Sequence, residues 1–153
     1  MAKVSVKING KKIEKEVSDN AILSDFIRDK LALTGTHIGC DTSQCGACVV
    51  HLDGNSVKSC TTLVADCDGS EITTIEGLAR NGKMHPMQEA FKKHHGLQCG
   101  FCTPGMVMSA VDLLQKNKNP SEQEIRNWLE GNICRCTGYQ GIVDAVKDAA
   151  SKM

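Results

Sequence analysis

The 153-residue sequence has few aromatic side chains: three Phe, one Tyr and one Trp, or 3% of the chain. A chain so poor in large rings needs a source of order besides its apolar core. Bound metal is one such source, because a metal that binds only the folded state stabilises that state. The length suits one or two small domains, since domains commonly span about 50–200 residues.

An excess of charge of one sign is also missing. The chain has 18 basic and 18 acidic residues, so its formal net charge is zero. No basic stripe indicates nucleic-acid binding, and no long block of like charge indicates a disordered tail. The composition therefore predicts a folded chain with no nucleic-acid partner.

A long hydrophobic run is absent as well. No stretch approaches the roughly 18 apolar residues that a membrane-spanning helix needs. Residues 1–17 alternate polar and apolar side chains and lack the apolar segment of a signal peptide. We therefore expect a cytoplasmic protein without a membrane span, and disulfides are disfavoured in that compartment.

What the sequence does contain is nine cysteines, which in a cytoplasmic chain indicate metal or redox chemistry. Four of them follow the order C-x4-C-x2-C and then a more distant Cys: Cys40, Cys45, Cys48 and Cys60. This is the spacing of plant-type [2Fe–2S] ferredoxins. Zinc sites instead use C-x2–4-C pairs on two knuckles, so the spacing favours iron–sulfur. Gly39, Gly46 and Ala47 are small enough for the backbone to pass close to a cluster.

A second quartet consists of Cys99, Cys102, Cys134 and Cys136. Each of its two pairs precedes an expected helix start. Two helix N-termini would then direct positive dipole ends and free N–H groups at an anionic thiolate site. This spacing matches no named cluster pattern, so spacing alone leaves both [2Fe–2S] and zinc open.

The first half of the chain has strand and turn signals. Asn9-Gly10 and Asp53-Gly54 predict tight turns. A helix is expected over 21–30, capped by Ser18 or Asp19. Period-two patterns and these turns predict strands over 3–8, 11–17, 47–52, 56–60 and 71–75. Together these elements describe a β-grasp, plant-type [2Fe–2S] ferredoxin domain over residues 1–76.

The second half has helix signals only. Pro86 and Thr103-Pro104 suit first helical turns, and Ser121-x-x-Glu124 is a capping-box pattern. After a polar linker over 77–84, helices are expected near 86–95, 103–116, 125–130 and 142–151. They predict a four-helix-bundle [2Fe–2S]-binding domain over residues 85–153. The fold class is therefore α+β.

Longer motifs resemble one known family. LQCGFCTPGM at 97–106 and GNICRCTGYQGIVDAV at 131–146 closely resemble the C-terminal half of the iron–sulfur (small) subunit of molybdenum hydroxylases, the xanthine oxidase family. GCDTSQCGACVV at 39–50 resembles its N-terminal half. The similarity covers nearly the whole chain and implies that the second quartet, like the first, holds a [2Fe–2S] cluster.

Within that family, HIGCDTSQCGAC, SVKSC and HGLQCGFCTPGM are most similar to the small subunit of aerobic carbon monoxide dehydrogenase. Subunits of enzymes for N-heterocycles, aldehydes or purines share most of these motifs. The family resemblance is therefore stronger than the resemblance to any one substrate group.

The resemblance implies an electron-transfer subunit. Electrons would run from a molybdopterin cofactor on a large subunit, through two [2Fe–2S] clusters on this chain, to FAD on a medium subunit, in a dimer of heterotrimers. By the same resemblance, Gln98 would hydrogen-bond the pterin and Cys136 would be the ligand closest to it. The second quartet would then lie near molybdenum and the first near FAD. No acid/base constellation for substrate chemistry stands out, so no catalytic residue is expected on this chain.

Two other hypotheses use the same cysteines. One is a freestanding two-cluster ferredoxin that binds its partners transiently. The other is a zinc-stabilised interaction module. The ninth cysteine, Cys67, stands outside both quartets, and a free thiol acting as a small apolar residue is its simplest role.

Overall fold

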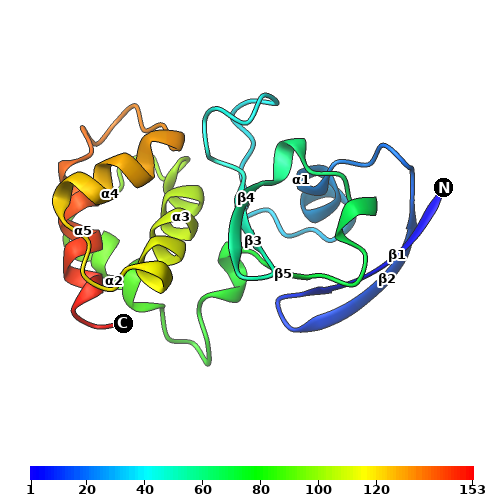
Figure 1. Cartoon of the computed structure of the whole chain (residues 1–153), viewed down its shortest axis with the longest axis horizontal. Coiled ribbons are helices and arrows are strands. Elements are labelled where there is room, and N and C mark those ends of the chain that lie inside the picture. The colour runs from blue at the N-terminus through cyan, green and yellow to red at the C-terminus, as the bar shows by residue number, and fades with distance from the viewer.

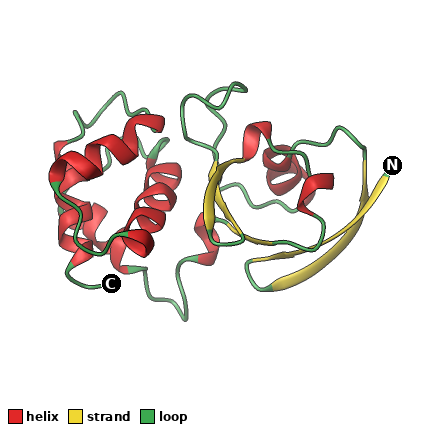
Figure 2. Ribbon diagram, viewed as in Figure 1, coloured by secondary structure: helices red, strands yellow, loops and turns green.

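The computed structural model describes all residues 1–153 and has two lobes, one built on a sheet and one built of helices (Figures 1 and 2). The N-terminal lobe contains β1 (Ala2–Ile8), β2 (Lys11–Val17), α1 (Leu23–Asp25), β3 (Val49–Leu52), β4 (Asn55–Lys58) and β5 (Glu71–Thr73). The C-terminal lobe contains α2 (Pro86–Lys93), α3 (Thr103–Lys116), α4 (Glu122–Trp128) and α5 (Gln140–Ala150).

The five strands form one mixed sheet in the order β2-β1-β5-β3-β4. The β1–β2 hairpin is antiparallel, with Ile8 opposite Lys11, and Asn9 and Gly10 form its turn with φ of 48° and 83°. Positive φ at both central residues is what a type I′ turn requires. β5 pairs with β1 in parallel and with β3 antiparallel.

The sheet lobe has its own apolar core. Alternate residues of β1 are buried, as a sheet with one covered face requires. Phe26 and Ile27 cover that face, and Cys67 belongs to the same cluster, whose buried members also include Val4, Val6, Ile8, Leu23, Val50 and Ile72.

The helix expected over 21–30 is shorter and less regular than predicted. Ile22 is extended and forms a β-bridge with Leu63, so the α-helical turn begins only at Leu23. No side chain caps it, which makes the expected cap at Ser18 or Asp19 wrong. From Phe26 to Lys30 the chain continues as a π-helical turn.

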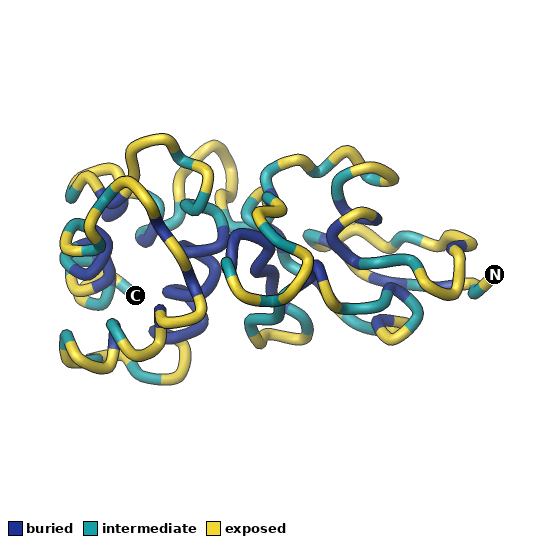
Figure 3. The backbone as a smooth tube through the Cα atoms, turned by 90° about the horizontal axis from the view of Figure 1, so that it is seen from above, coloured by how far each residue is buried: buried dark blue, intermediate teal, exposed yellow.

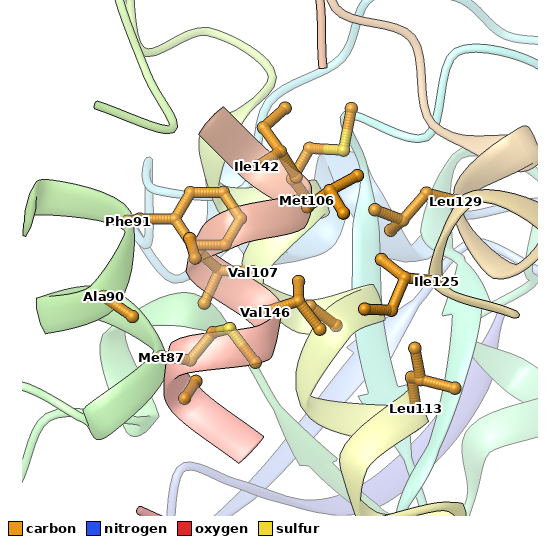
Figure 4. Packing of buried hydrophobic residues seen from close by; sticks show 14 of the residues in the cluster. Met87, Ala90, Phe91, Met106, Val107, Leu113, Ile125, Leu129, Ile142 and Val146 are labelled. Carbon is orange, nitrogen blue, oxygen red and sulfur yellow. The ribbon is translucent and has the colours of Figure 1, made fainter. Parts of the chain in front are cut away.

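The helical lobe has a second core, made by α2, α3, α4 and α5. Phe91, Met106, Ile142 and Val146 are buried and point toward one another from three helices (Figure 4). The capping box predicted at Ser121 is confirmed, since its hydroxyl accepts from the N–H of Glu124 and the Glu124 carboxylate accepts from the N–H of Ser121. His85 caps α2: its Nδ1 accepts from the N–H of Met87, and the Gln88 side-chain oxygen accepts from the N–H of His85.

The two lobes meet where α3 packs against β3 (Figure 1), and Figure 3 shows buried chain in that region. Gly105 of α3 lies so close to Gly46 and Ala47 that a Cβ there would overlap the carbonyl oxygen of Gly46. His51 on β3 contacts the carbonyl oxygen of Met108, with 2.7 Å between Nε2 and O. The inter-lobe contact is therefore direct backbone and side-chain packing.

A ferredoxin-like sheet domain followed by a helical domain is thus confirmed. The boundaries at 1–76, 77–84 and 85–153 stay a prediction. None of the helices combines the length and the apolar character that crossing a bilayer requires.

Candidate metal centres

The first quartet gathers on one loop and one short turn. Cys40, Cys45 and Cys48 lie in the loop that leads into β3, and Cys60 lies in the 3-10 turn Ser59–Thr61 that follows β4. None of the nine cysteines forms a disulfide. Cys48 and Cys60 are buried, whereas Cys40 and Cys45 remain half-buried. One side of the quartet is therefore buried in the protein, and the other side is partly exposed to solvent.

Backbone N–H groups of this loop point at its sulfurs. The N–H of Cys45 lies 3.4 Å from Sγ of Cys40, and the N–H of Ala47 lies 3.5 Å from Sγ of Cys45. Hydrogen bonds from the N–H groups of Cys45 and Thr42 lower the pKa of the Cys40 thiol to about 6. The loop thus stabilises a thiolate, which is the form that binds metal.

Cys60, unlike Cys40, lies in surroundings that favour the neutral thiol over the thiolate. Burial first, and then the neighbouring Cys48 and Cys40, together raise the pKa of its thiol to about 11. A cluster of sulfur ligands held close together in a buried place is stable as thiolates only when a cation compensates their charge.

Glycine is required where this loop passes close to other groups. A Cβ on Gly39 would lie 3.1 Å from Sγ of Cys45. Gly46 has φ of +75°, and a Cβ there would also overlap Gly131 and Asn132 of the helical lobe. The small size of the residues beside the cysteines therefore also allows the helical lobe to pack against this loop.

The second quartet lies at the start of α3 and in the loop before α5. Cys102 immediately precedes α3, as expected, but α5 begins at Gln140, so Cys134 and Cys136 lie in a loop and not beside a helix N-terminus. The sulfurs of Cys99 and Cys136 are 3.5 Å apart, and both residues are exposed. Cys102 and Cys134 form the inner pair.

The pKa values of the inner pair, Cys102 and Cys134, shift in opposite directions. Burial, and then the neighbouring Cys134, raise the pKa of the Cys102 thiol to about 12. Burial alone would raise the pKa of Cys134 too, but hydrogen bonds from Thr137 lower it. The Thr137 hydroxyl donates to Sγ of Cys134 over 3.1 Å, and the Tyr139 hydroxyl accepts from its backbone N–H over 2.9 Å.

In both quartets the sulfurs gather in pairs. The sulfurs of Cys99 and Cys136 are in contact in the second quartet. The thiols of Cys40 and Cys45, of Cys60 and Cys48, and of Cys102 and Cys134 are close enough for one to shift the pKa of the other. No three Cys, His, Asp or Glu side chains converge as ligands of a single ion would. Two thiolates for each of two irons suit this arrangement, whereas tetrahedral zinc needs all four ligands around one point. The residues therefore fit a two-iron cluster better than zinc.

Residues 131–133, hereafter the bridge segment, join the two quartets just before Cys134. The N–H of Ile133 donates to the carbonyl oxygen of Cys45 over 2.8 Å. The Asn132 side-chain amide donates to the carbonyl oxygen of Gly46 over 3.2 Å. The Cys45 loop of the sheet lobe is thus hydrogen-bonded to Ile133, the residue that precedes Cys134 in the helical lobe.

A second link joins the same loops through side chains. The imidazole of His37 stacks on the ring of Phe101 with centroids 4.8 Å apart, and His37 Nδ1 lies 2.7 Å from the Phe101 carbonyl oxygen. Phe101 lies between Cys99 and Cys102, and His37 lies three residues before Cys40. Sequence reasoning did not find this contact or the bridge segment, because their partners are far apart along the chain.

The remaining site candidates differ in accessibility. Gln98 is exposed and immediately precedes the exposed Cys99, so it lies at the same end as Cys136. Cys67 lies in the sheet core, where its thiol contacts the carbonyl oxygen of Leu63 over 3.4 Å and burial raises its pKa. It belongs to neither quartet.

Two family models match the chain. A "2Fe-2S iron-sulfur cluster binding domain" matches residues 6–79, and a "[2Fe-2S] binding domain" matches residues 74–147. Each match contains one quartet. Known relatives match the chain over both of these domains. The nicotine 6-hydroxylase small subunit of Paenarthrobacter nicotinovorans is 47% identical over 98% of this chain and 90% of its own length. The chain belongs to the small iron–sulfur subunits of molybdenum hydroxylases.

Other members of this family are similar over nearly the whole chain as well. The caffeine dehydrogenase subunit gamma of Pseudomonas sp. (strain CBB1) is 45% identical over 96% of the chain and 90% of its own length. The crystal structure of quinoline 2-oxidoreductase from Pseudomonas putida 86 contains a chain with a TM-score of 0.95 and 42% identity, over 98% of this chain and 94% of that one. As a family member, this chain is an iron–sulfur subunit of an oxidoreductase complex and carries two [2Fe–2S]-binding domains.

Proposed function

We propose that each quartet ligates one [2Fe–2S] cluster through four thiolates. The first cluster would be bound by Cys40, Cys45, Cys48 and Cys60, and the second by Cys99, Cys102, Cys134 and Cys136. The pairing of sulfurs supports this ligand set. When bound, such clusters accept and release single electrons.

The chain then relays electrons between two partner subunits. The observation that carries this proposal is the hydrogen bond from the Ile133 N–H to the Cys45 carbonyl oxygen. Because Cys45 and the neighbour of Ile133, Cys134, are both proposed ligands, a short route of covalent bonds and one hydrogen bond connects the two sites. The packing of Gly105 against Gly46 holds that route rigid.

The relay has a direction in this proposal. Gln98 and Cys136 face a molybdopterin cofactor on a large subunit, where the Gln98 amide hydrogen-bonds the pterin. The first quartet faces FAD on a medium subunit. The exposure of Gln98, Cys99 and Cys136 supports this, because a surface that receives a partner must be open in the chain alone.

The assembly is a dimer of heterotrimers in the cytoplasm, and the chain consists of domains at 1–76 and 85–153 with a linker at 77–84. None of the nine cysteines forms a disulfide, which supports a reducing compartment. The names of the relatives, which are subunits of larger enzymes, support a stable complex.

Four substrate classes remain in view: carbon monoxide, N-heterocycles, aldehydes and purines. The motif HIGCDTSQCGAC favours carbon monoxide. The names of the relatives refer instead to nicotine, caffeine, quinoline, aldehydes and xanthine. Assays of the purified complex with a substrate of each class separate them, and a class that is not turned over is rejected.

Metal and sulfide analysis tests the cluster assignment. The complex should contain about four irons and four acid-labile sulfides for each copy of this chain, two per site. Cys102→Ser should remove the electron paramagnetic resonance signal of the second cluster and keep that of the first. Zinc without sulfide would reject the proposal in favour of a zinc module. Purification as a stable monomer with both clusters would favour a freestanding ferredoxin.

A further inference from the structure

Lys58 connects the two cysteine-bearing loops through contacts that neither cysteine spacing predicts. It is the last residue of β4, two residues before Cys60. Its Nζ donates to the carbonyl oxygen of Gly131 over 2.6 Å and to that of Ser43 over 3.1 Å. Ser43 lies between Cys40 and Cys45, and Gly131 begins the bridge segment that leads to Cys134.

The charge of this ammonium is not matched by a carboxylate. The ion pairs of the structure involve other cationic groups, and Lys58 takes part in none of them. Both of its acceptors are neutral carbonyl groups. A Cβ on Gly131 would lie 3.2 Å from Nζ, so the ammonium is held closely against the bridge segment.

We propose that Lys58 is a positioning residue for electron transfer whose fixed positive charge raises the reduction potentials of both clusters. This inference rests on the proposed ligation of a cluster by each quartet. A cluster bound by four thiolates is anionic, and its reduction adds one further negative charge. A cation held near it stabilises the reduced form more than the oxidised form.

The shared position has a further effect. Since the same ammonium is bonded to a loop of each quartet, it acts on both clusters in the same direction. It also fixes the bridge segment against the first ligand loop through two hydrogen bonds. The Lys58 side chain therefore both places a positive charge beside the two loops and holds the bridge segment in position.

A redox titration of the complete enzyme complex, followed by electron paramagnetic resonance of each cluster, tests this inference. Lys58→Gln keeps a hydrogen-bond donor and removes the charge, and Lys58→Arg keeps both. At the wild-type midpoint potential, Lys58→Gln should lower the ratio of reduced to oxidised cluster at least about threefold, where tenfold corresponds to about 59 mV for one electron. Lys58→Arg should leave the ratio within about twofold of wild type.

Lys15→Gln is the matched control. Lys15 also donates to a backbone carbonyl, that of Lys30 over 3.3 Å, but it lies on β2 at the opposite edge of the sheet from β4. Its substitution should leave both potentials unchanged. An equal fall in Lys15→Gln would show a general effect of net charge and would overturn the proposal.

The remaining outcomes are also decisive. Unchanged potentials in Lys58→Gln, or an equal fall in Lys58→Arg, would overturn the role of the charge. If Lys58→Gln loses a cluster, Lys58→Arg decides alone: wild-type potentials support the proposal and lowered ones reject it. Absence of iron and sulfide from the wild-type complex would instead reject the proposed function, so the two failures are distinguishable.

Discussion

The nine cysteines differ first in what surrounds each sulfur. Cys40 receives backbone hydrogen bonds that favour its thiolate, whereas burial favours the neutral thiols of Cys60 and Cys102. Cys67 is buried among apolar residues and has no cysteine partner. Identical side chains therefore have different pKa values because backbone N–H groups lower the pKa of a thiol and burial raises it.

Cys67→Ser tests the separation of the ninth cysteine from the quartets. The hydroxyl is more costly than the thiol in an apolar core, so the variant should lose about 1–2 kcal/mol of unfolding free energy in urea. Both cluster signals should persist in electron paramagnetic resonance. Cys48→Ser is the control that should lose the first signal, and disappearance of either signal in Cys67→Ser would contradict the assignment.

Spacing in the sequence anticipated which cysteines come together, but it did not anticipate the groups around them. A ligand loop is local, so C-x4-C-x2-C is visible in nine residues. Lys58 and Gly131, by contrast, are 73 residues apart, and their contact exists only because α3 brings the helical lobe onto β3. Thr137 could have been noticed beside Cys136, since a hydroxyl next to a ligand is a common donor to sulfur.

At the scale of elements, strong local signals gave the right structures. Asn9-Gly10 forms the expected turn, and Thr103-Pro104 begins a helix that runs to Lys116, as expected. The strand expected over 47–52 begins only at Val49, because residues 47–48 belong to the ligand loop. The helix expected over 21–30 failed for a similar reason, since the bridge from Ile22 to Leu63 overrides helix propensity.

Gly105→Ala tests the approach of α3 to the first ligand loop. Alanine favours a helix by up to about 1 kcal/mol over glycine, but the new Cβ would overlap the Gly46 carbonyl oxygen, a backbone atom. We expect a net loss of about 1–3 kcal/mol in urea unfolding and a changed signal of the first cluster.

Gln115→Ala, on the exposed side of the same helix, is the control and should change stability by less than about 0.5 kcal/mol. A gain of stability in Gly105→Ala would mean that propensity outweighs the close contact. The packing of α3 on β3 would then be looser than the structure describes.

At the scale of the whole molecule, a buried carboxylate holds the lobes together. Asp112 of α3 is 1% exposed and accepts hydrogen bonds from the N–H of Ser56 on β4, over 3.1 Å, and from the Ser56 hydroxyl. Lys116 donates to it over 3.0 Å. Burial would raise the pKa of Asp112, but the bonds from Ser56 and Lys116 hold it below the ordinary 3.8.

The pH dependence of this joint follows from the sign of that shift. A carboxylate with a lowered folded pKa stabilises fully above its unfolded pKa and loses that contribution only as the pH falls through the folded value. Asp112→Asn should therefore lose about 1–3 kcal/mol of unfolding free energy, and by the same amount at pH 8 and at pH 5.

Urea unfolding of both proteins at the two pH values checks this expectation. A deficit that already shrinks between pH 8 and pH 5 would indicate that burial outweighs the hydrogen bonds and raises the pKa. Asp19→Asn, which removes an exposed pairing with the N-terminus, is the surface control and should change stability little.

The close approach of Gly105 to Gly46 also limits how the two halves can be exchanged among relatives. Each half has its own apolar core, which suggests interchangeable modules. A chimera that joins one half to the other half of a relative would nevertheless need a glycine at both positions and a carboxylate opposite Ser56. Crossover points in protein engineering should therefore be chosen by these inter-lobe partners, and not by the linker at 77–84 alone.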